Sequence, residues 1–156
     1  MATLPDLDAP LRAAILNDSS ITALLPTYKN SHPVFTKRPV RKDTTAPYIV
    51  IHQNNNLTHN DGVNDQRITV DKELTIYDAA NPPPEGWRKI DQIGRLIAAR
   101  FHRRPHNLVL NTADAAHWKV IDIRVTTRGF PPFDVLAQNV GFTVVLSIIL
   151  ASKNTQ

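Results

Sequence analysis

Histidines are the first residues in this chain whose type and spacing could support chemistry. His102 and His106 lie four residues apart, the spacing at which two imidazoles on one helix face can bind a metal ion. Pro105 stands between them and would break such a helix. We therefore expect no metal site here, and we expect these histidines to lie on the surface.

Other patterns for catalysis or cofactor binding are also missing. Asp61, Asn64 and Asp65 with Gly62 resemble part of a calcium loop, but the spacing and the closing glutamate of an EF-hand are absent. No serine lies in a Gly-x-Ser-x-Gly frame, and the glycines are too scattered for a phosphate loop. We expect no enzyme and no cofactor, while an active site assembled from distant residues stays open as an alternative.

The composition is that of one globular domain, which we expect to cover residues 1–156. Hydrophobic residues make up 42% of the chain, which is enough for a core, and the lack of cysteine excludes disulfides. The N-terminal residues do not follow the pattern of a signal peptide. The longest apolar stretch, residues 140–151, is too short to span a bilayer, so we expect no membrane contact.

Positive charge is concentrated in the second half of the chain. Residues 1–80 contain 8 basic and 9 acidic side chains, whereas residues 81–156 contain 10 and 5. Basic clusters at 37–42 and 100–104 are compatible with binding to nucleic acid or to an acidic partner. They are also compatible with a solvated loop and a helix C-terminus, and the lack of aromatic residues in the first cluster favours that interpretation.

Helical periodicity predicts short helical turns near the N-terminus and one long helix. The first turn has Asp8 as its expected N-cap, and Ser19 or Ser20 is expected to cap a second one. The long helix follows the prolines at 82–84 and runs to about Arg103, with Gly94 beside its apolar stripe. We expect core positions at Leu11, Ile15 and Leu16 in the first helix and at Trp87, Ile90, Ile93, Ile97 and Phe101 in the long one.

Alternation of apolar and polar residues predicts the first strands. Residues 26–46 form a proline-rich extended arm, with an edge strand at about 34–40. A strand over 48–52 is followed by a long polar loop or hairpin extension over 53–66, and a half-buried strand covers 67–78. Lys72 interrupts the apolar face of that strand, which predicts a bulge or an exposed end.

The last third of the chain contains three further predicted strands. A short one covers 108–110, a second covers 118–127 with Ile121, Ile123 and Val125 on one face, and a long one covers 136–150. The other face of the last strand carries Val145 and Ile149, which a second copy of the protein could cover. We expect an α+β fold, with an antiparallel or mixed sheet of four to five strands and one long and one short helix packed on one face.

The order of these motifs resembles a known family. A short helix is followed by Ala-Pro-Tyr-Ile-Val-Ile at 46–51, a polar segment, Ile-Thr-Val-Asp-Lys-Glu-Leu-Thr-Ile-Tyr-Asp at 68–78, and a helix with Ile-x-x-Ile-Gly-x-Leu-Ile at 90–97. Two long strands close the chain. This pattern, over roughly residues 8–150, resembles the tail-terminator and tail-completion proteins of long-tailed bacteriophages.

The resemblance implies a structural virion protein of the tail or neck, assembled in the host cytoplasm. Such a subunit forms a hexameric ring that caps the tail tube and joins it to the head–tail connector, while genomic DNA passes through the lumen without sequence-specific binding. Lumen-facing roles would fall to Lys42, Arg103 and Arg104. Subunit contacts would involve Asn54, Asn55, Asn56, Leu57, His59, Asp61, Val63, Lys37, Arg38, Arg41, Val145 and Ile149.

Two other functions remain open at the level of the sequence. The chain could be another neck or head–tail joining protein of similar fold. It could also be a small basic nucleic-acid-binding domain, which the charge excess after residue 80 would suit.

Overall fold

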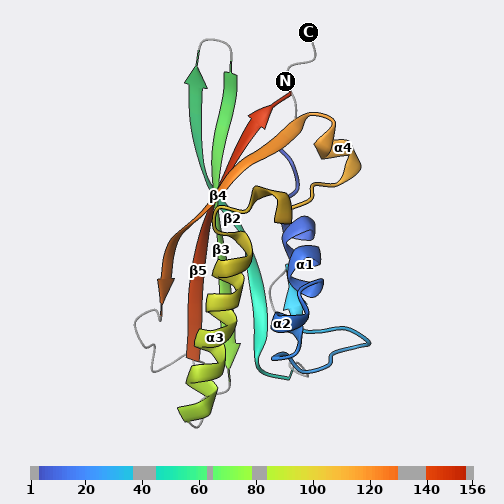
Figure 1. The fold of residues 1–156 in the computed structure, drawn as a ribbon, viewed down its shortest axis with the longest axis vertical. Coiled ribbons are helices and arrows are strands. Elements are labelled where there is room, and N and C mark those ends of the chain that lie inside the picture. The colour runs from blue at the N-terminus through green and yellow to red at the C-terminus, as the bar shows by residue number, and fades with distance from the viewer. Residues whose placement is uncertain (1–3, 37–44, 63–64, 79–83, 130–139, 154–156) are drawn as a thin grey trace.

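The computed structural model describes residues 4–36, 45–62, 65–78, 84–129 and 140–153, and it has an α+β fold (Figure 1). Helices and strands alternate irregularly along the chain, as the sequence predicts for this class. The elements are α1 (Asp8–Leu16), α2 (Ser19–Thr22), β1 (Val34–Phe35), β2 (Tyr48–Gly62), β3 (Asp65–Asp78), α3 (Pro84–Phe101), the 3₁₀ turn η1 (Pro105–Asn107), α4 (Thr112–Ala115), β4 (Trp118–Gly129) and β5 (Val140–Ser152).

Five described strands form one mixed sheet in the order β1-β2-β3-β5-β4. Only the β1–β2 pair is parallel; the other neighbours in the described sheet are antiparallel. β1 lies at one edge, which confirms the predicted edge strand, although residues 37–40 lie outside the described residues. The proline at position 33 is compatible with an edge strand, because it lacks the backbone N–H that a central strand would need to donate.

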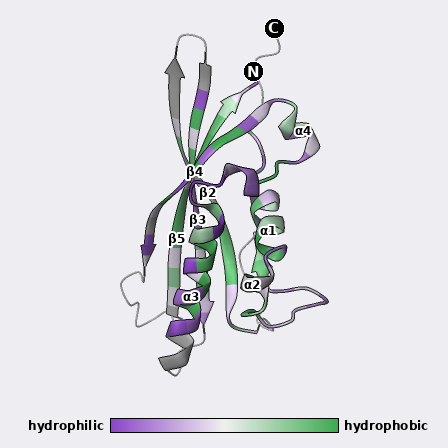
Figure 2. Cartoon of the chain, viewed as in Figure 1, coloured by the Kyte–Doolittle hydropathy of each residue, from purple (hydrophilic) through white to green (hydrophobic). Residues whose placement is uncertain are grey.

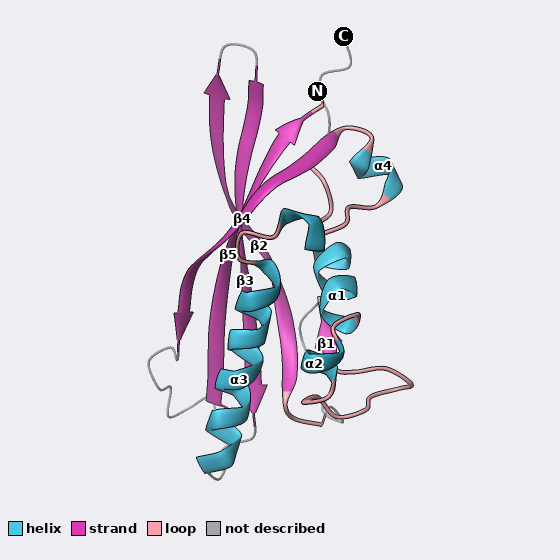
Figure 3. Cartoon of the chain, in the orientation of Figure 1, coloured by secondary structure: helices cyan, strands magenta, loops and turns pink. Residues whose placement is uncertain are grey.

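The core lies between one face of the sheet and the helices (Figures 2 and 3). From α3, the predicted stripe of Ile90, Ile93, Ile97 and Phe101 is fully buried, while Trp87 lies outside the residues whose side chains are described. Gly94 explains how closely α3 approaches β5: a Cβ there would lie 2.3 Å from the ring of Phe142. None of the described helices is long and apolar enough to cross a bilayer.

The polar segment after residue 52 continues the hairpin instead of forming a loop. Residues 55–62 of β2 pair with residues 65–72 of β3, so the hairpin-extension alternative holds and the long polar loop over 53–66 was wrong. Ladder hydrogen bonds join backbone groups and tolerate polar side chains, and Leu57 adds an apolar contact with the core. The closed end of this hairpin extends beyond α1, α2 and α3 (Figure 1).

Lys72 is the one buried charge among the described core residues, with no exposed side-chain surface. The predicted bulge is present, but in the partner strand, where the register shifts between Ile51 and Asn55; the predicted exposed end is wrong. The Lys72 ammonium donates to the His52 carbonyl in that irregular segment, at 2.7 Å, and forms an ion pair with Asp8. These two contacts replace the water that the charge has lost.

Asp8 therefore does not cap α1, contrary to the prediction. The N-cap position is Leu7, whose apolar side chain cannot accept a hydrogen bond, and the carboxylate of Asp8 forms an ion pair with Lys72. The second turn is capped by Asp18, which accepts from the Ser20 backbone N–H at 3.0 Å, and not by either serine. The core positions predicted for α1 are confirmed, with Leu11 and Ile15 fully buried.

Two predictions about the strands after α3 are wrong. Residues 108–110 alternate correctly, with Val109 exposed between buried Leu108 and Leu110, but their backbone is not part of a described strand. In β4, Ile121 does not share a face with Ile123, since the register shift between Val120 and Asp122 leaves Ile121 as an extra residue. A second shift follows between Val125 and Thr127. Alternation alone cannot reveal such bulges.

Candidate functional site

No group of three or more His, Asp or Glu side chains within the described residues could hold a metal ion. The nearest arrangement to a catalytic group is His52 with Thr75 and Glu73. The same imidazole nitrogen, Nε2, lies 2.9 Å from the Thr75 hydroxyl oxygen and 3.9 Å from a Glu73 carboxylate oxygen. A relay from hydroxyl through imidazole to carboxylate needs both ring nitrogens, so this geometry does not activate Thr75.

The second face of the sheet is a candidate surface for contacts with other proteins. Side chains at alternate positions point away from α1 and α3, and in Figure 3 the helices lie on the other side. Val145 and Ile149 of β5 are half-buried on this face, next to Asp122 and Glu73 of the neighbouring strands. Both were predicted as interface residues, and the structure places them on the face that the described helices do not cover.

An aromatic row crosses the same face where β1, β2 and β3 lie side by side. Phe35 contacts Tyr28 and Tyr48 edge-on, with ring centroids 5.5 Å and 6.2 Å apart, and Tyr48 stacks on Tyr77 at 5.3 Å. The residue beside Tyr77 on β5 is Gly141, where a Cβ would lie 3.5 Å from the tyrosine ring. The sequence analysis missed this row, because its members are brought together only by the strand register.

The other predicted contact residues fall into two groups. Leu57 packs against the core side of the hairpin, and the remaining hairpin positions lie on β2, with side chains outside the described set: Asn54, Asn55, Asn56, His59 and Asp61. Five further residues lie outside the described residues altogether: Lys37, Arg38, Arg41, Lys42 and Val63. Their roles remain predictions.

The basic residues after α3 are exposed, and one of them forms a hydrogen bond and an ion pair within the chain. Arg103 adopts positive φ, at 58°, and its backbone N–H donates to the Ile123 carbonyl at 2.7 Å. Its guanidinium lies 3.2 Å from a carboxylate oxygen of Asp122, which also accepts from Arg124 at 3.0 Å. Arg104 is exposed.

These contacts lower the pKa of Asp122. The hydrogen bond from Arg124 is the main cause, and it outweighs the partial burial of the carboxyl, which acts in the opposite direction. The backbone N–H of Ile123 and the charges of Arg103 and Arg124 lower the pKa further. Asp122 thus ties the turn after α3 to the edge strand β4.

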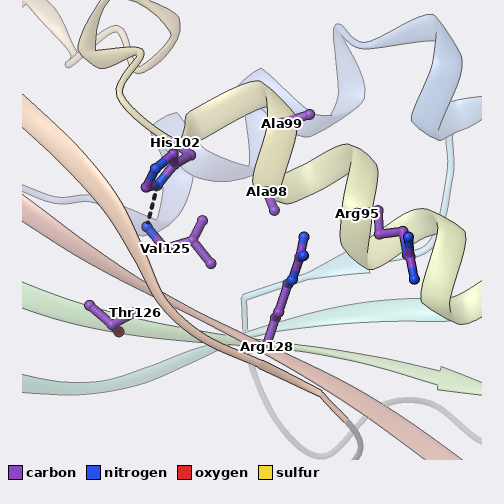
Figure 4. Close-up of a pocket in the computed structure, with 7 residues that line it drawn as sticks. All are labelled: Arg95, Ala98, Ala99, His102, Val125, Thr126 and Arg128. Carbon is purple, nitrogen blue, oxygen red and sulfur yellow. Dashed lines mark hydrogen bonds between the residues drawn. The ribbon is translucent and has the colours of Figure 1, made fainter.

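A pocket of about 500 Å³ lies between α3 and β4 (Figure 4). The helix contributes three residues, His102 follows directly after its last residue, and the strand contributes three from its second bulge onward. His102 is fixed across the pocket, since its Nδ1 accepts from the Val125 backbone N–H at 3.0 Å. The lining residues are Arg95, Ala98, Ala99, His102, Val125, Thr126 and Arg128.

Comparison with known proteins identifies a similar fold but no family. No protein-family model matches the sequence, and no curated protein matches it either. A solved structure described as "Virion of native gene transfer agent (GTA) particle" contains a chain with the same fold, at a TM-score of 0.70 and 10% sequence identity. The similarity covers 93% of this chain and 94% of that one.

Proposed function

We propose that this protein is a structural component of a phage-like virion and works by assembly with other proteins instead of catalysis. The observation that carries the proposal is the fold shared with a chain of the gene transfer agent virion over nearly the whole length of both chains. The virion particle is accordingly the location that we propose.

Within the virion, we propose the role of tail terminator. The chain would form a hexameric ring that caps the tail tube and contacts the head–tail connector, with DNA passing through the lumen. The sequence resemblance supports this assignment through the strand at 46–51, the strand at 68–78 and the helix at 90–97. Another neck or joining protein of the same fold would share these features.

The second sheet face supplies the physical basis for assembly. Val145 and Ile149 are half-buried there, and the aromatic row lies on the same face. Apolar groups gain free energy when a neighbouring subunit removes them from water. A head-to-tail contact of this kind closes into a ring when the rotation between neighbours is a whole fraction of a turn.

Charge substitution on this face tests the proposal. In Val145→Asp and Ile149→Asp, a carboxylate would be desolvated at the subunit contact, while the free subunit could keep it solvated. We expect folded subunits by circular dichroism, but particles whose heads and tails remain separate in electron micrographs. Arg88→Asp, at an exposed position of α3, is the matched control and should leave joining intact.

Joined particles with tails of normal length in both face variants would count against this use of the sheet. Separate heads and tails in the Arg88→Asp control as well would indicate general sensitivity to added negative charge.

A further inference from the structure

We propose that the pocket between α3 and β4 binds an extended, acidic segment of a partner protein. This inference does not depend on the tail-terminator role, because it rests on the shape and charge of one recess. The α3 side of the pocket is a single helical stripe, formed by residues at positions i, i+3, i+4 and i+7: Arg95, Ala98, Ala99 and His102.

The dimensions of the recess suit an extended chain. Seven residues of helix rise by about 10 Å, which is the length of about three residues of a β-strand. The middle of the stripe consists of two alanines, whose small side chains leave the space open above them. On the opposite side lies β4, which contributes Val125, Thr126 and Arg128 to the recess.

Three nitrogen-bearing side chains line this recess. Arg128 extends from β4 toward α3 (Figure 4), and its guanidinium has no ion-pair partner within the part of the chain that the structure describes. Arg95 is 67% exposed in its side chain, and Asp91 neutralises one side of it through a bond of 3.0 Å. Its remaining donors can still bind a carboxylate.

His102 provides a third donor. Because Nδ1 accepts from the Val125 N–H, the proton of the neutral imidazole is on Nε2, which can donate to an anion. The recess therefore offers two guanidinium groups and one imidazole N–H, with Val125 and the two alanines between them. Alternate side chains of an extended segment point the same way, so carboxylates at alternate positions can face these donors together.

A protein segment fits the recess better than nucleic acid does. No phenylalanine, tyrosine or tryptophan lines the pocket, so the large stacking surfaces typical of single-strand binding are missing there. Duplex DNA presents phosphates along a broad convex rod, whereas these donors surround one recess. We therefore assign the site to carboxylates.

Fluorescence anisotropy with three labelled probes tests the proposal on the full chain. The probes are a peptide of sequence Asp-Val-Glu-Val-Asp, the same peptide with Asn and Gln in place of Asp and Glu, and a short DNA duplex. We expect the acidic peptide to bind and the amide peptide not to bind. Arg128→Gln should weaken acidic-peptide binding about tenfold, the effect of one lost charge-assisted hydrogen bond.

Two further variants separate the recess from general attraction to a basic protein. Ala99→Trp fills the space without altering charge and should abolish binding of the acidic peptide. Arg88→Gln removes an exposed cation elsewhere on α3 and should leave binding unchanged. Equal losses in Arg88→Gln and Arg128→Gln would overturn the proposal.

So would DNA binding that requires Arg128 in the absence of peptide binding, or self-association of the chain that Arg128→Gln abolishes. The first result would assign the recess to nucleic acid, and the second would assign it to contacts between copies.

Discussion

At the scale of single residues, the ion pair between Lys72 and Asp8 joins the first helix to the middle of the sheet. Lys72 is fully buried, whereas the Asp8 side chain retains 23% of its exposure. An unpaired Asp8 can therefore be partly hydrated, but an unpaired Lys72 cannot. Breaking a buried pair from one side typically costs about 3–5 kcal/mol.

We predict that Asp8→Ala lowers the free energy of unfolding more than Lys72→Met does. The double variant should recover most of the loss, because no buried charge then remains. Urea unfolding of the four proteins at one pH measures the three differences. A larger loss in Lys72→Met than in Asp8→Ala would show that Asp8 is the more strongly desolvated partner.

Asp122 gives a prediction about pH. Since its pKa is lower in the folded state, its ionised form stabilises the fold above the ordinary carboxyl pKa of about 4, and this stabilisation is lost as the pH falls through the folded value. Asp122→Asn should lower stability at pH 7 by about 1 kcal/mol, as for other partly exposed ion pairs. Urea unfolding at several pH values should show the difference between variant and parent shrinking toward low pH; a constant difference would exclude the charge as its cause.

At the scale of elements, the contact between α3 and β5 sets the thickness of the core. Gly94→Ala gains helix propensity of about 1 kcal/mol, but its Cβ would clash with the Phe142 ring, and overpacking typically costs about 1–3 kcal/mol. We predict a net loss of stability in thermal unfolding. Gln92→Ala, at an exposed position of the same helix, should be neutral or stabilising.

Phe142→Leu provides the reciprocal check on this contact. It should be less destabilising in the Gly94→Ala background than in the parent, because the smaller side chain makes room for the added methyl group. Additive losses would mean that the helix moves away from the sheet instead.

Residue patterns predicted the helices and strands far better than the irregularities within them and the contacts between them. The apolar stripe from Ile90 to Phe101 and the alternation from Ile68 to Ile76 locate α3 and β3, because those periods follow from the helix and strand geometry themselves. The burial of Lys72 could not be predicted, since it depends on a bulge in β2 and on the carboxylate of Asp8 in another element. The face of Ile121 could not be predicted either, since it depends on a bulge in β4.

The residues of the candidate surfaces likewise divide into those that follow from the pattern of one element and those that depend on contacts between elements. Val145 and Ile149 were identified from one strand, because their exposure follows from alternation. The stripe from Arg95 to His102 was not predicted. Its position opposite Arg128 could not be predicted from the sequence, since the bulge at 125–127 decides which face Arg128 occupies.

At the scale of the whole molecule, the structure has one covered sheet face and one that the described helices leave open. A chain of the gene transfer agent virion has the same fold at only 10% identity, so very different sequences can specify this architecture.

The proposed function requires that copies of this chain pack against one another within a virion. Electron cryomicroscopy of intact particles that contain the chain measures this directly. We predict a closed ring of copies at the junction of head and tail, with Val145 and Ile149 buried against a neighbouring subunit. A resolved junction without this chain, or with the chain present and its open sheet face in contact with solvent, would contradict the account.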